Sequence, residues 1–297
     1  MSGISQVGTG PQSRPVIRGG LVTHASRKRA KVVLGYGLGI TVTLAWLFPL
    51  IWMLLTSFKT RPDIFNRIPS FVFAPTLDNY AALFANSEFV GALMNSVKVA
   101  SSSTVIAIAV GVICAYPLSR IRFTARDKVL NWILSLRMMP AVATVVPFYL
   151  ILHVLGLLDS WPGLVVAYLS FSVPFATWML IGFFQDLPKE LDEAAFLDGC
   201  SHWQVVWHIH LPNLRTAIAV TAIFTFVFAW NELALALMLT EVNMKTVPVA
   251  IIGMIQPDDI PWGQISAGST IMLIPMVMVV FALQKHIVSG LTLGAVK

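Results

Sequence analysis

The feature that most constrains this chain is an apolar run, Val32–Phe58, which has no charged residue over 27 positions. A helix needs about 20 apolar residues to cross a bilayer, whereas the apolar region of a secretory signal has about 7–15. The run therefore predicts a transmembrane helix. Composition agrees, because only 11% of the residues are charged and the mean hydropathy is +0.78, while soluble domains carry about 25% charged residues.

Five further apolar segments approach the same spanning length. They are Val99–Ser119, Val129–Leu152, Trp161–Phe184, Ala217–Leu239 and Gln264–Gln284. Each is close to the ~20 residues that a membrane-spanning helix requires. The sequence therefore predicts an all-α, polytopic membrane protein with six transmembrane helices.

Lysine and arginine are distributed unevenly between the connecting segments. If the N-terminus lies inside the cell, the inner segments hold 14 of the 20 basic residues and the outer segments hold four. This asymmetry follows the positive-inside rule, and it explains the net charge of +6 better than nucleic-acid binding does. We expect a disordered cytoplasmic tail at 1–31, a six-helix domain at 32–288 with a cytoplasmic loop at 186–212, and a cytoplasmic C-terminal tail at 289–297.

The cytoplasmic loop contains a polar stretch, Glu190–Pro212, in an otherwise apolar sequence. Its pattern predicts two short helices that are separated at Gly199. Pro188 suits the start of the first helix, because the N–H that proline lacks has no partner there. Gly199 suits a left-handed C-terminal cap, and Ser201 can cap the second helix by accepting a backbone N–H.

Several catalytic and ligand-binding classes lack their sequence signatures. The chain has no G-x-x-x-x-G-K-[ST] phosphate loop, no H-E-x-x-H and no G-x-S-x-G. His208 and His210 are two residues apart and do not share a helix face, so no metal site is expected. Two cysteines cannot build a disulfide framework. A secondary transporter and a polytopic membrane enzyme remain the alternatives to an ATP-driven transport subunit.

The polar stretch also carries a motif with fixed spacing. Its residues are Glu193, Ala194, Ala195, Asp198, Gly199, Ile209, Leu211 and Pro212. The motif resembles the "EAA loop" of ABC importer permeases. The resemblance implies the type I ABC importer permease fold, in which this loop is a coupling helix that docks on a separate ATPase.

Resemblance to the carbohydrate branch of that family extends along the chain. It includes Trp230-Asn231-Glu232, Trp262-Gly263-Gln264 and the C-terminal sequence G-L-T-L-G-A-V-K. The branch includes permeases of the maltose and trehalose type. By resemblance, the tail that contacts the ATPases consists of Gly290, Leu291, Thr292, Gly294, Ala295, Val296 and Lys297.

The resemblance implies a function and a set of partners. The chain would be a permease subunit that moves a sugar, oligosaccharide or polyol inward by alternating access. Its partners would be a second homologous permease, two ATPase subunits that bind ATP and magnesium, and an extracytoplasmic solute-binding protein. The complex would lie in the inner membrane of a bacterium or archaeon, with both termini of this chain in the cytoplasm. The chain itself would be no enzyme and would bind no cofactor.

Two charged residues fall inside predicted spans, Arg137 and Glu232. An ionisable group that faces lipid near the bilayer centre costs at least ~2.5 kcal/mol, so each should face a cavity or a partner. They could line a sugar path, together with Asn231 and Gln264. Alternatively, Arg137 could bind carbonyl groups freed by Pro140, and Glu232 could bind a helix of a second permease. The sequence leaves both readings open.

Overall fold

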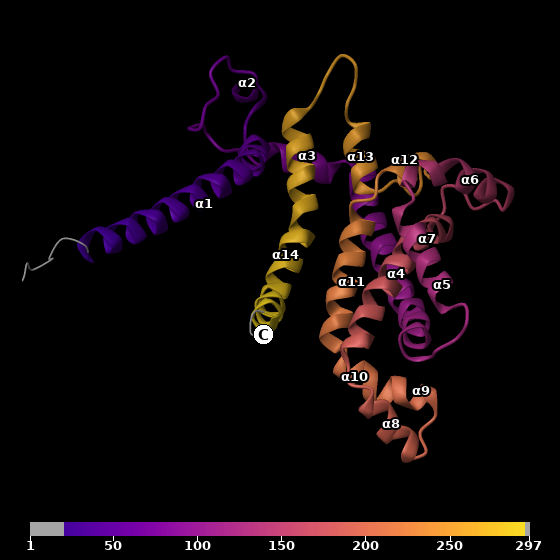
Figure 1. The fold of residues 1–297 in the computed structure, drawn as a ribbon. Coiled ribbons are helices and arrows are strands. Elements are labelled where there is room, and N and C mark those ends of the chain that lie inside the picture. The colour runs from indigo at the N-terminus through magenta and orange to yellow at the C-terminus, as the bar shows by residue number, and fades with distance from the viewer. Residues whose placement is uncertain (1–20, 295–297) are drawn as a thin grey trace, which may run out of the picture. The chain divides into compact units, whose positions relative to one another are not determined.

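The computed structural model describes residues 21–294, which form helices joined by loops and contain no β-strand (Figure 1). Within this range, side chains are described for 32–140, 142–278 and Phe281. The chain separates into two units, 1–52 and 53–297. The first unit is described by most of helix α1 (Leu21–Ser57), whose side chains from Val32 to Ile51 are all exposed. Exposure of so many apolar side chains is expected of a helix that is surrounded by lipid or by another membrane protein.

The second unit contains the end of α1 and the remaining helices. They are α2 (Arg61–Ile64), α3 (Asp78–Ala85), α4 (Ser87–Arg120), α5 (Arg126–Met138), α6 (Ala141–Val154), α7 (Trp161–Asp186), α8 (Glu190–Leu197), α9 (His202–Val205), the π-helix η1 (Val206–His210), α10 (Leu211–Asn213), α11 (Arg215–Trp230), α12 (Ala234–Leu239), α13 (Val247–Gly253) and α14 (Trp262–Gly294). The expectation of an all-helical chain is met over the described residues.

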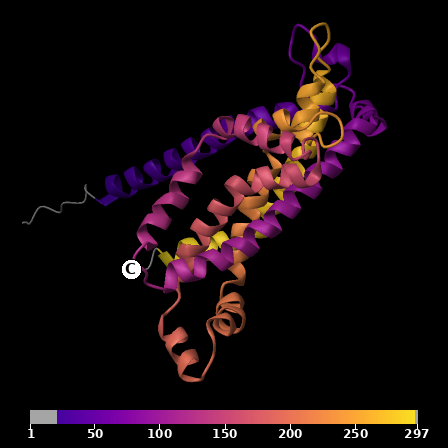
Figure 2. The same ribbon diagram turned by 90° about the vertical axis from the view of Figure 1, so that its right-hand side faces the viewer.

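Helices α4, α7 and α11 pack side by side and form the centre of this unit (Figures 1 and 2). The α4–α7 contact is close at Gly111, where an added Cβ would lie 3.1 Å from the Cβ of Ala176. Small residues at such a contact let two helices approach within a membrane. Substitution of Gly111 by a larger residue would therefore push α7 away from α4.

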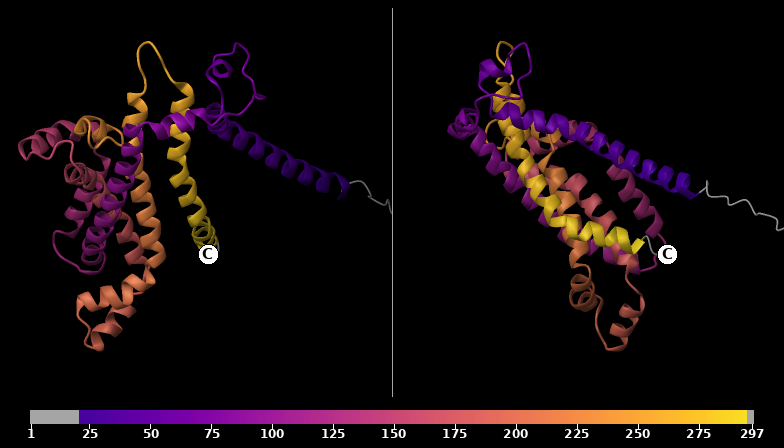
Figure 3. Two further views of the ribbon diagram at one scale, coloured as in Figure 1. Left: turned by 180° about the vertical axis from the view of Figure 1, so that it is seen from behind. Right: turned by 90° about the vertical axis from the view of Figure 1, so that its left-hand side faces the viewer.

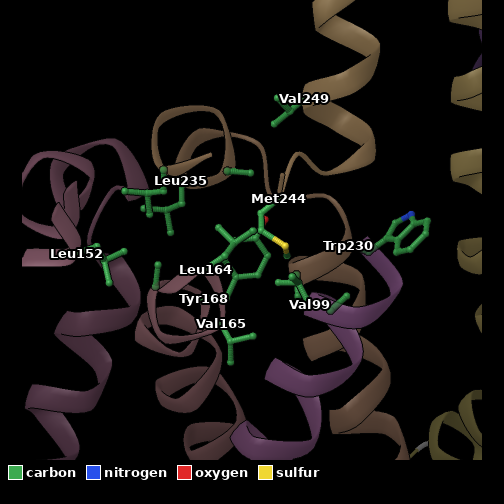
Figure 4. Close-up of a cluster of buried hydrophobic side chains, with 14 of the residues drawn as sticks. Val99, Leu152, Leu164, Val165, Tyr168, Trp230, Leu235, Met244 and Val249 are labelled. Carbon is green, nitrogen blue, oxygen red and sulfur yellow. The ribbon is translucent and has the colours of Figure 1, made fainter. Parts of the chain in front are cut away.

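The largest buried cluster lies where α6, α7, α11 and α12 meet the middle of α4 (Figure 4). Tyr168 and Trp230 are its largest side chains, and both are nearly fully buried. The indole Nε1 of Trp230 donates a hydrogen bond to the Met272 carbonyl at 3.0 Å, so the buried N–H has a partner. This bond attaches α14 to the end of α11.

The structure refines the predicted spans. Three helices of the described chain are long and apolar enough to cross a membrane: Val32–Ser57, Ser87–Arg120 and Trp161–Asp186. Two helix pairs would raise the number to five if each is one bent span. The sixth predicted span corresponds to α14, whose later side chains are outside the description. The count of six therefore stays a prediction.

Two of the predicted spans are interrupted in the structure. The segment Val129–Leu152 is divided into α5 and α6 by a bend of 95°, because Pro140 has no N–H to continue the helical hydrogen bonding. The segment Ala217–Leu239 is one helix only as far as Trp230, and α12 begins after a three-residue break.

Candidate functional site

The Glu190–Pro212 segment forms a hairpin of short helices that projects beyond the Arg120 end of α4 (Figures 2 and 3). Its first arm, α8, follows α7 after three residues. Its second arm, made of α9, η1 and α10, leads into α11 through a bend of 80°. The segment is thus connected by the chain to two of the three central helices.

The turn between the two arms has the predicted geometry. Gly199 has φ = +84°, a conformation that side chains with a Cβ adopt only at a cost. Ser201 caps α9 by accepting the Gln204 N–H at 3.4 Å, while the Gln204 side chain accepts the Ser201 N–H at 2.7 Å. This reciprocal capping box fixes the second arm at its start.

The second arm is not the simple α-helix that was expected. The N–H of Leu211 donates to the carbonyl of Val206, five residues earlier, which makes η1 a π-turn. Pro212 lacks an N–H and its ring would clash with the carbonyl four residues earlier in a regular α-helix, so a wider turn is favoured before it. The turn directs the His210 side chain into the protein, where it is fully buried.

The motif residues of the segment lie on a mostly exposed surface. Glu193, Ala194, Asp198, Gly199 and Pro212 are exposed, Ile209 and Leu211 are half-buried, and Ala195 is buried. Beside them on α8, Leu197 is 90% exposed. An exposed carboxylate next to small and apolar side chains can dock against a protein surface that offers a positive charge and an apolar cleft.

A second face of α8, which carries Asp192, makes a buried ionic contact with α4. Asp192 Oδ2 lies 3.1 Å from Arg120 Nε, and Asp192 Oδ1 lies 2.5 Å from His210 Nε2. The Arg120, Asp192 and His210 side chains are 5%, 10% and 0% exposed. The contact between Arg120 and Asp192 is thus a buried ion pair, and the His210 imidazole lies against the second carboxylate oxygen.

The surroundings of His210 favour its neutral form. Burial lowers the pKa of its imidazole below the ordinary value and Arg120 also lowers it, while the Asp192 carboxylate opposes both effects. The imidazole ring packs against the rings of Tyr116 and Phe184, with centroids 5.4 and 5.3 Å away. Arg120 therefore supplies the positive charge that balances Asp192.

Sequence reasoning did not find this buried contact. In the sequence, Asp192 is one of three acidic residues near the start of α8, where the helix dipole favours negative charge, and Arg120 is one of the basic residues of a predicted inner segment. The spacing of the residues does indicate two faces. Asp192 and Ala195 are three residues apart and share one face of the helix, whereas Glu193 lies on a different face.

The structure does not bring the four proposed sugar-path residues together. Arg137 is exposed at the end of α5 and stacks on the rings of Phe175 and Trp178, at 4.9 and 4.3 Å from their centroids. Among the described side chains, no hydrogen bond or ion pair joins Arg137 to Asn231, Glu232 or Gln264. Their role in a sugar path stays a prediction.

Asn231, Glu232 and Gln264 have local contacts. Asn231 Nδ2 donates to the Val227 carbonyl at 2.7 Å, and Glu232 Oε1 accepts the Leu235 N–H at 3.0 Å. Both side chains thus satisfy backbone groups at the break between α11 and α12. Gln264 lines a small pocket of about 170 Å³.

Two further expectations concern metal and the tail. The described residues contain no group of histidine, cysteine or carboxylate side chains that could hold a metal ion. The tail residues from Gly290 to Gly294 continue α14, but their side chains are outside the description, and 295–297 lie outside the described residues altogether. The structure therefore does not test the predicted contact of the tail with an ATPase.

Comparison of the sequence with known proteins identifies a family. The family described as "Binding-protein-dependent transport system inner membrane component" matches residues 107–293. The trehalose transport system permease protein SugB of Mycobacterium tuberculosis is 37% identical, over 84% of this chain and 92% of that protein. The trehalose/maltose transport system permease protein MalG of Thermococcus litoralis is 35% identical, over 91% of this chain and 97% of that protein.

Solved structures give the same result for the fold. A bacterial ABC transporter that imports the acidic polysaccharide alginate matches with a TM-score of 0.70 at 20% identity, over 88% of this chain and 97% of that chain. The same transporter type, in complex with an alginate pentasaccharide-bound periplasmic protein, matches with a TM-score of 0.66 at 16% identity, over the same shares. The chain therefore belongs to the binding-protein-dependent transport system inner membrane components, the permease subunits of ABC transporters.

Proposed function

We propose that this chain is one permease subunit of an importer that moves a sugar, oligosaccharide or polyol into the cell by alternating access. A separate ATPase drives it through the Glu190–Pro212 segment. The observation that carries the proposal is the two-sided character of α8. Its Glu193 side is exposed and free to meet a partner, while its Asp192 side is buried against α4. A helix that served only to end a membrane span would not need an exposed acidic face in addition to a buried one.

The substrate class rests on the relatives. The names of two of them specify trehalose, or trehalose and maltose, and that of a third, from Agrobacterium fabrum and 35% identical over 84% of this chain and 89% of that protein, specifies sulfoquinovosyl glycerol. All three ligands are built from sugars or a sugar-linked polyol. The relatives are transport permeases, which gives no support to the alternatives of a secondary transporter or a membrane enzyme.

The proposed complex contains a second homologous permease, two ATPase subunits and an extracytoplasmic solute-binding protein. The exposed apolar side chains from Val32 to Ile51 support an apolar neighbour, which a second permease and membrane lipid would provide. The absence of a phosphate loop from the sequence supports placing ATP and magnesium on the ATPases. We assign the complex to an inner membrane, with the Glu190–Pro212 segment and both termini in the cytoplasm, and the C-terminal tail against the ATPases.

Charge reversal at Glu193 tests this function. Glu193 is exposed and makes no ion pair within the described chain, so Glu193→Lys should leave the fold of the permease intact. If Glu193 meets a positive charge on the ATPase, reversal turns attraction into repulsion, which costs several kcal/mol at an interface. ATP-driven uptake of a sugar panel containing trehalose and maltose should then be lost, together with co-purification of the ATPase.

A matched control is Asp127→Lys, which makes the same type of charge reversal at an exposed residue near the start of α5. The control should transport as the unmodified chain does. The proposal is wrong if Glu193→Lys retains both uptake and ATPase binding, or if both variants lose transport equally.

A further inference from the structure

The Arg120 end of α4 contacts both arms of the Glu190–Pro212 segment and the linker that precedes it. Arg120 meets Asp192 on α8, and its Nη2 also donates to the Leu187 carbonyl at 2.8 Å, between α7 and α8. Tyr116 Oη lies 2.9 Å from His202 Nδ1 on α9. Tyr116 and Arg120 are four residues apart and share one face of α4. One helix face therefore contacts both arms of the hairpin.

These contacts restrict the movement of α8 relative to α4, which the chain connections alone would allow. Without them, the chain itself would attach α8 through the short linker after α7 and through the Gly199 turn. Backbone dihedrals in two such loops can absorb a displacement, as hinge residues do. With them, a movement of α8 requires α4 to move as well, or the contact between Asp192 and Arg120 to break.

Burial makes breaking that contact unfavourable. The side chains of Arg120 and Asp192 are at most one-tenth exposed, and separation would leave each charge buried without its counter-charge. Loss of one partner from a buried ion pair is strongly destabilising. The buried His210 ring contacts the second carboxylate oxygen of Asp192 and packs against the rings of Tyr116 and Phe184. The contact is therefore a stiff one.

We propose that Arg120, Asp192 and His210 are positioning residues that join α8 to α4, so that the two move as one rigid body when the ATPase displaces the segment. This inference rests on the coupling function proposed above. Glu193 receives the displacement on the exposed side of α8, and the three buried residues pass it to α4. Because α4 packs along α7, the displacement reaches the centre of the helix bundle without passing through the loop that joins α7 to α8.

Distances between spin labels test this directly in the full complex with its ATPases. Cys114 and Cys200 are first replaced by serine, and labels are attached at Leu197→Cys on α8 and Ile121→Cys at the end of α4, which are both exposed sites. The distance is measured in lipid vesicles without nucleotide and after trapping with ATP and vanadate. The proposal predicts the same distance in both states. A distance that differs between the two states overturns it, and this measurement needs no destabilising variant.

Asp192→Asn provides the second measurement, because it keeps the side-chain shape and removes the charge. We expect the distance distribution to broaden and to change with nucleotide, and ATP-driven uptake to fall at least about fivefold, the lower end of typical coupling between sites. Co-purification of the ATPase should persist, since Glu193 is unchanged. Asp127→Asn, the same substitution at an exposed site, should alter none of these.

The two proposals fail in different ways. Unchanged distances and unchanged uptake in Asp192→Asn would refute the rigid contact while leaving the role of Glu193 intact. Normal uptake and ATPase binding in Glu193→Lys would instead refute the coupling function itself.

Discussion

Asp159 is the residue at which a conservative substitution should have the clearest local effect. Its carboxylate accepts hydrogen bonds from four successive backbone N–H groups between Glu241 and Met244, at 2.8–3.1 Å, and a fifth from the Asn243 side chain at 2.9 Å. Its backbone has φ = 50°, the left-handed region that asparagine and aspartate tolerate better than other residues with a Cβ. The residue thus shapes the loop between α12 and α13.

Asp159→Asn keeps the side-chain shape and the backbone preference but replaces one acceptor oxygen by an NH₂ group. Oδ1 accepts two of the five hydrogen bonds and Oδ2 accepts three. If the new NH₂ group takes the position of Oδ1, the N–H groups of Glu241 and Met244 still face a donor instead of an acceptor. Hydrogen bonds to a charged group contribute ~1.5–3 kcal/mol each, and water can replace part of this at a half-exposed site. We expect a local loss of ~2 kcal/mol, which corresponds to roughly a 30-fold higher population of the opened loop.

Hydrogen exchange of the amides from Glu241 to Met244 measures this opening. Asp159→Gly is the matched control for the backbone, because it removes the carboxylate without strain at positive φ. Asp159→Ala should add ~1–2 kcal/mol of strain to the lost bonds. The expected order of protection is therefore wild type, then Asn and Gly, then Ala. Equal protection in wild type and Asp159→Asn would refute the reasoning.

The same loop should depend on pH. Partial burial alone would raise the pKa of Asp159, but the backbone N–H groups between Glu241 and Met244 outweigh it and hold the pKa below the ordinary value of 3.8. A carboxyl group with a depressed pKa contributes its stabilisation fully above the unfolded pKa and loses it as the pH falls through the folded pKa. Protection of the loop amides should therefore stay constant at neutral pH and fall below pH 3.8. Asp159→Gly should show no such fall.

Two further predictions concern Gly199 and Arg137. No atom lies within 4 Å of a Cβ built at Gly199, so Gly199→Val should cost only the backbone strain of ~1–2 kcal/mol. Because asparagine tolerates the left-handed conformation better, Gly199→Val should lower ATPase co-purification more than Gly199→Asn does. Equal ATPase binding by the two variants would show that the turn is not strained. Arg137→Gln removes the stacking on Trp178, which contributes ~0.5–1 kcal/mol at an exposed site. If Arg137 lines the sugar path, the apparent KM for sugar should change while the complex still assembles. Unchanged kinetics would indicate a structural role.

The parts of the fold that the sequence predicted well depend on local chemistry. The left-handed turn at Gly199 and the cap at Ser201 each involve residues within four positions of one another. The uninterrupted span Trp161–Phe184 was placed within two residues of α7. In such cases the residue type and its immediate neighbours determine the conformation, so tertiary structure adds little.

The parts that the sequence did not predict depend on contacts between distant segments. Asp192 meets Arg120 across 72 positions, and Asp159 binds amides more than 80 positions away. Lys59 lies in one of the predicted outer segments, and the sequence does not show that it is 2% exposed, with its ammonium 5.1 Å from the ring centroid of Phe73. A charged residue in a short polar stretch looks solvated in the sequence, and only the fold shows that another segment covers it.

Helix α4 has polar attachments at both ends. At its Ser87 end, Asn95 Nδ2 donates to the carbonyls of Asn243 and Lys245, at 2.8 and 3.1 Å, in the loop that Asp159 shapes. Ser96 Oγ accepts the Val247 N–H at 2.8 Å at the start of α13.

At the Arg120 end, the same helix holds the Glu190–Pro212 segment. A continuous helix from Ser87 to Arg120 is about 50 Å long at 1.5 Å per residue, and its backbone hydrogen bonds resist bending along most of that length. A displacement of α8 that moves α4 must therefore also act on the loop around Asn243. If the Glu190–Pro212 segment docks on an ATPase as proposed, α4 connects that docking site to the loop around Asn243. The hydrogen bonds of Asn95 and Ser96 would then transmit the same displacement as the buried contact between Arg120 and Asp192.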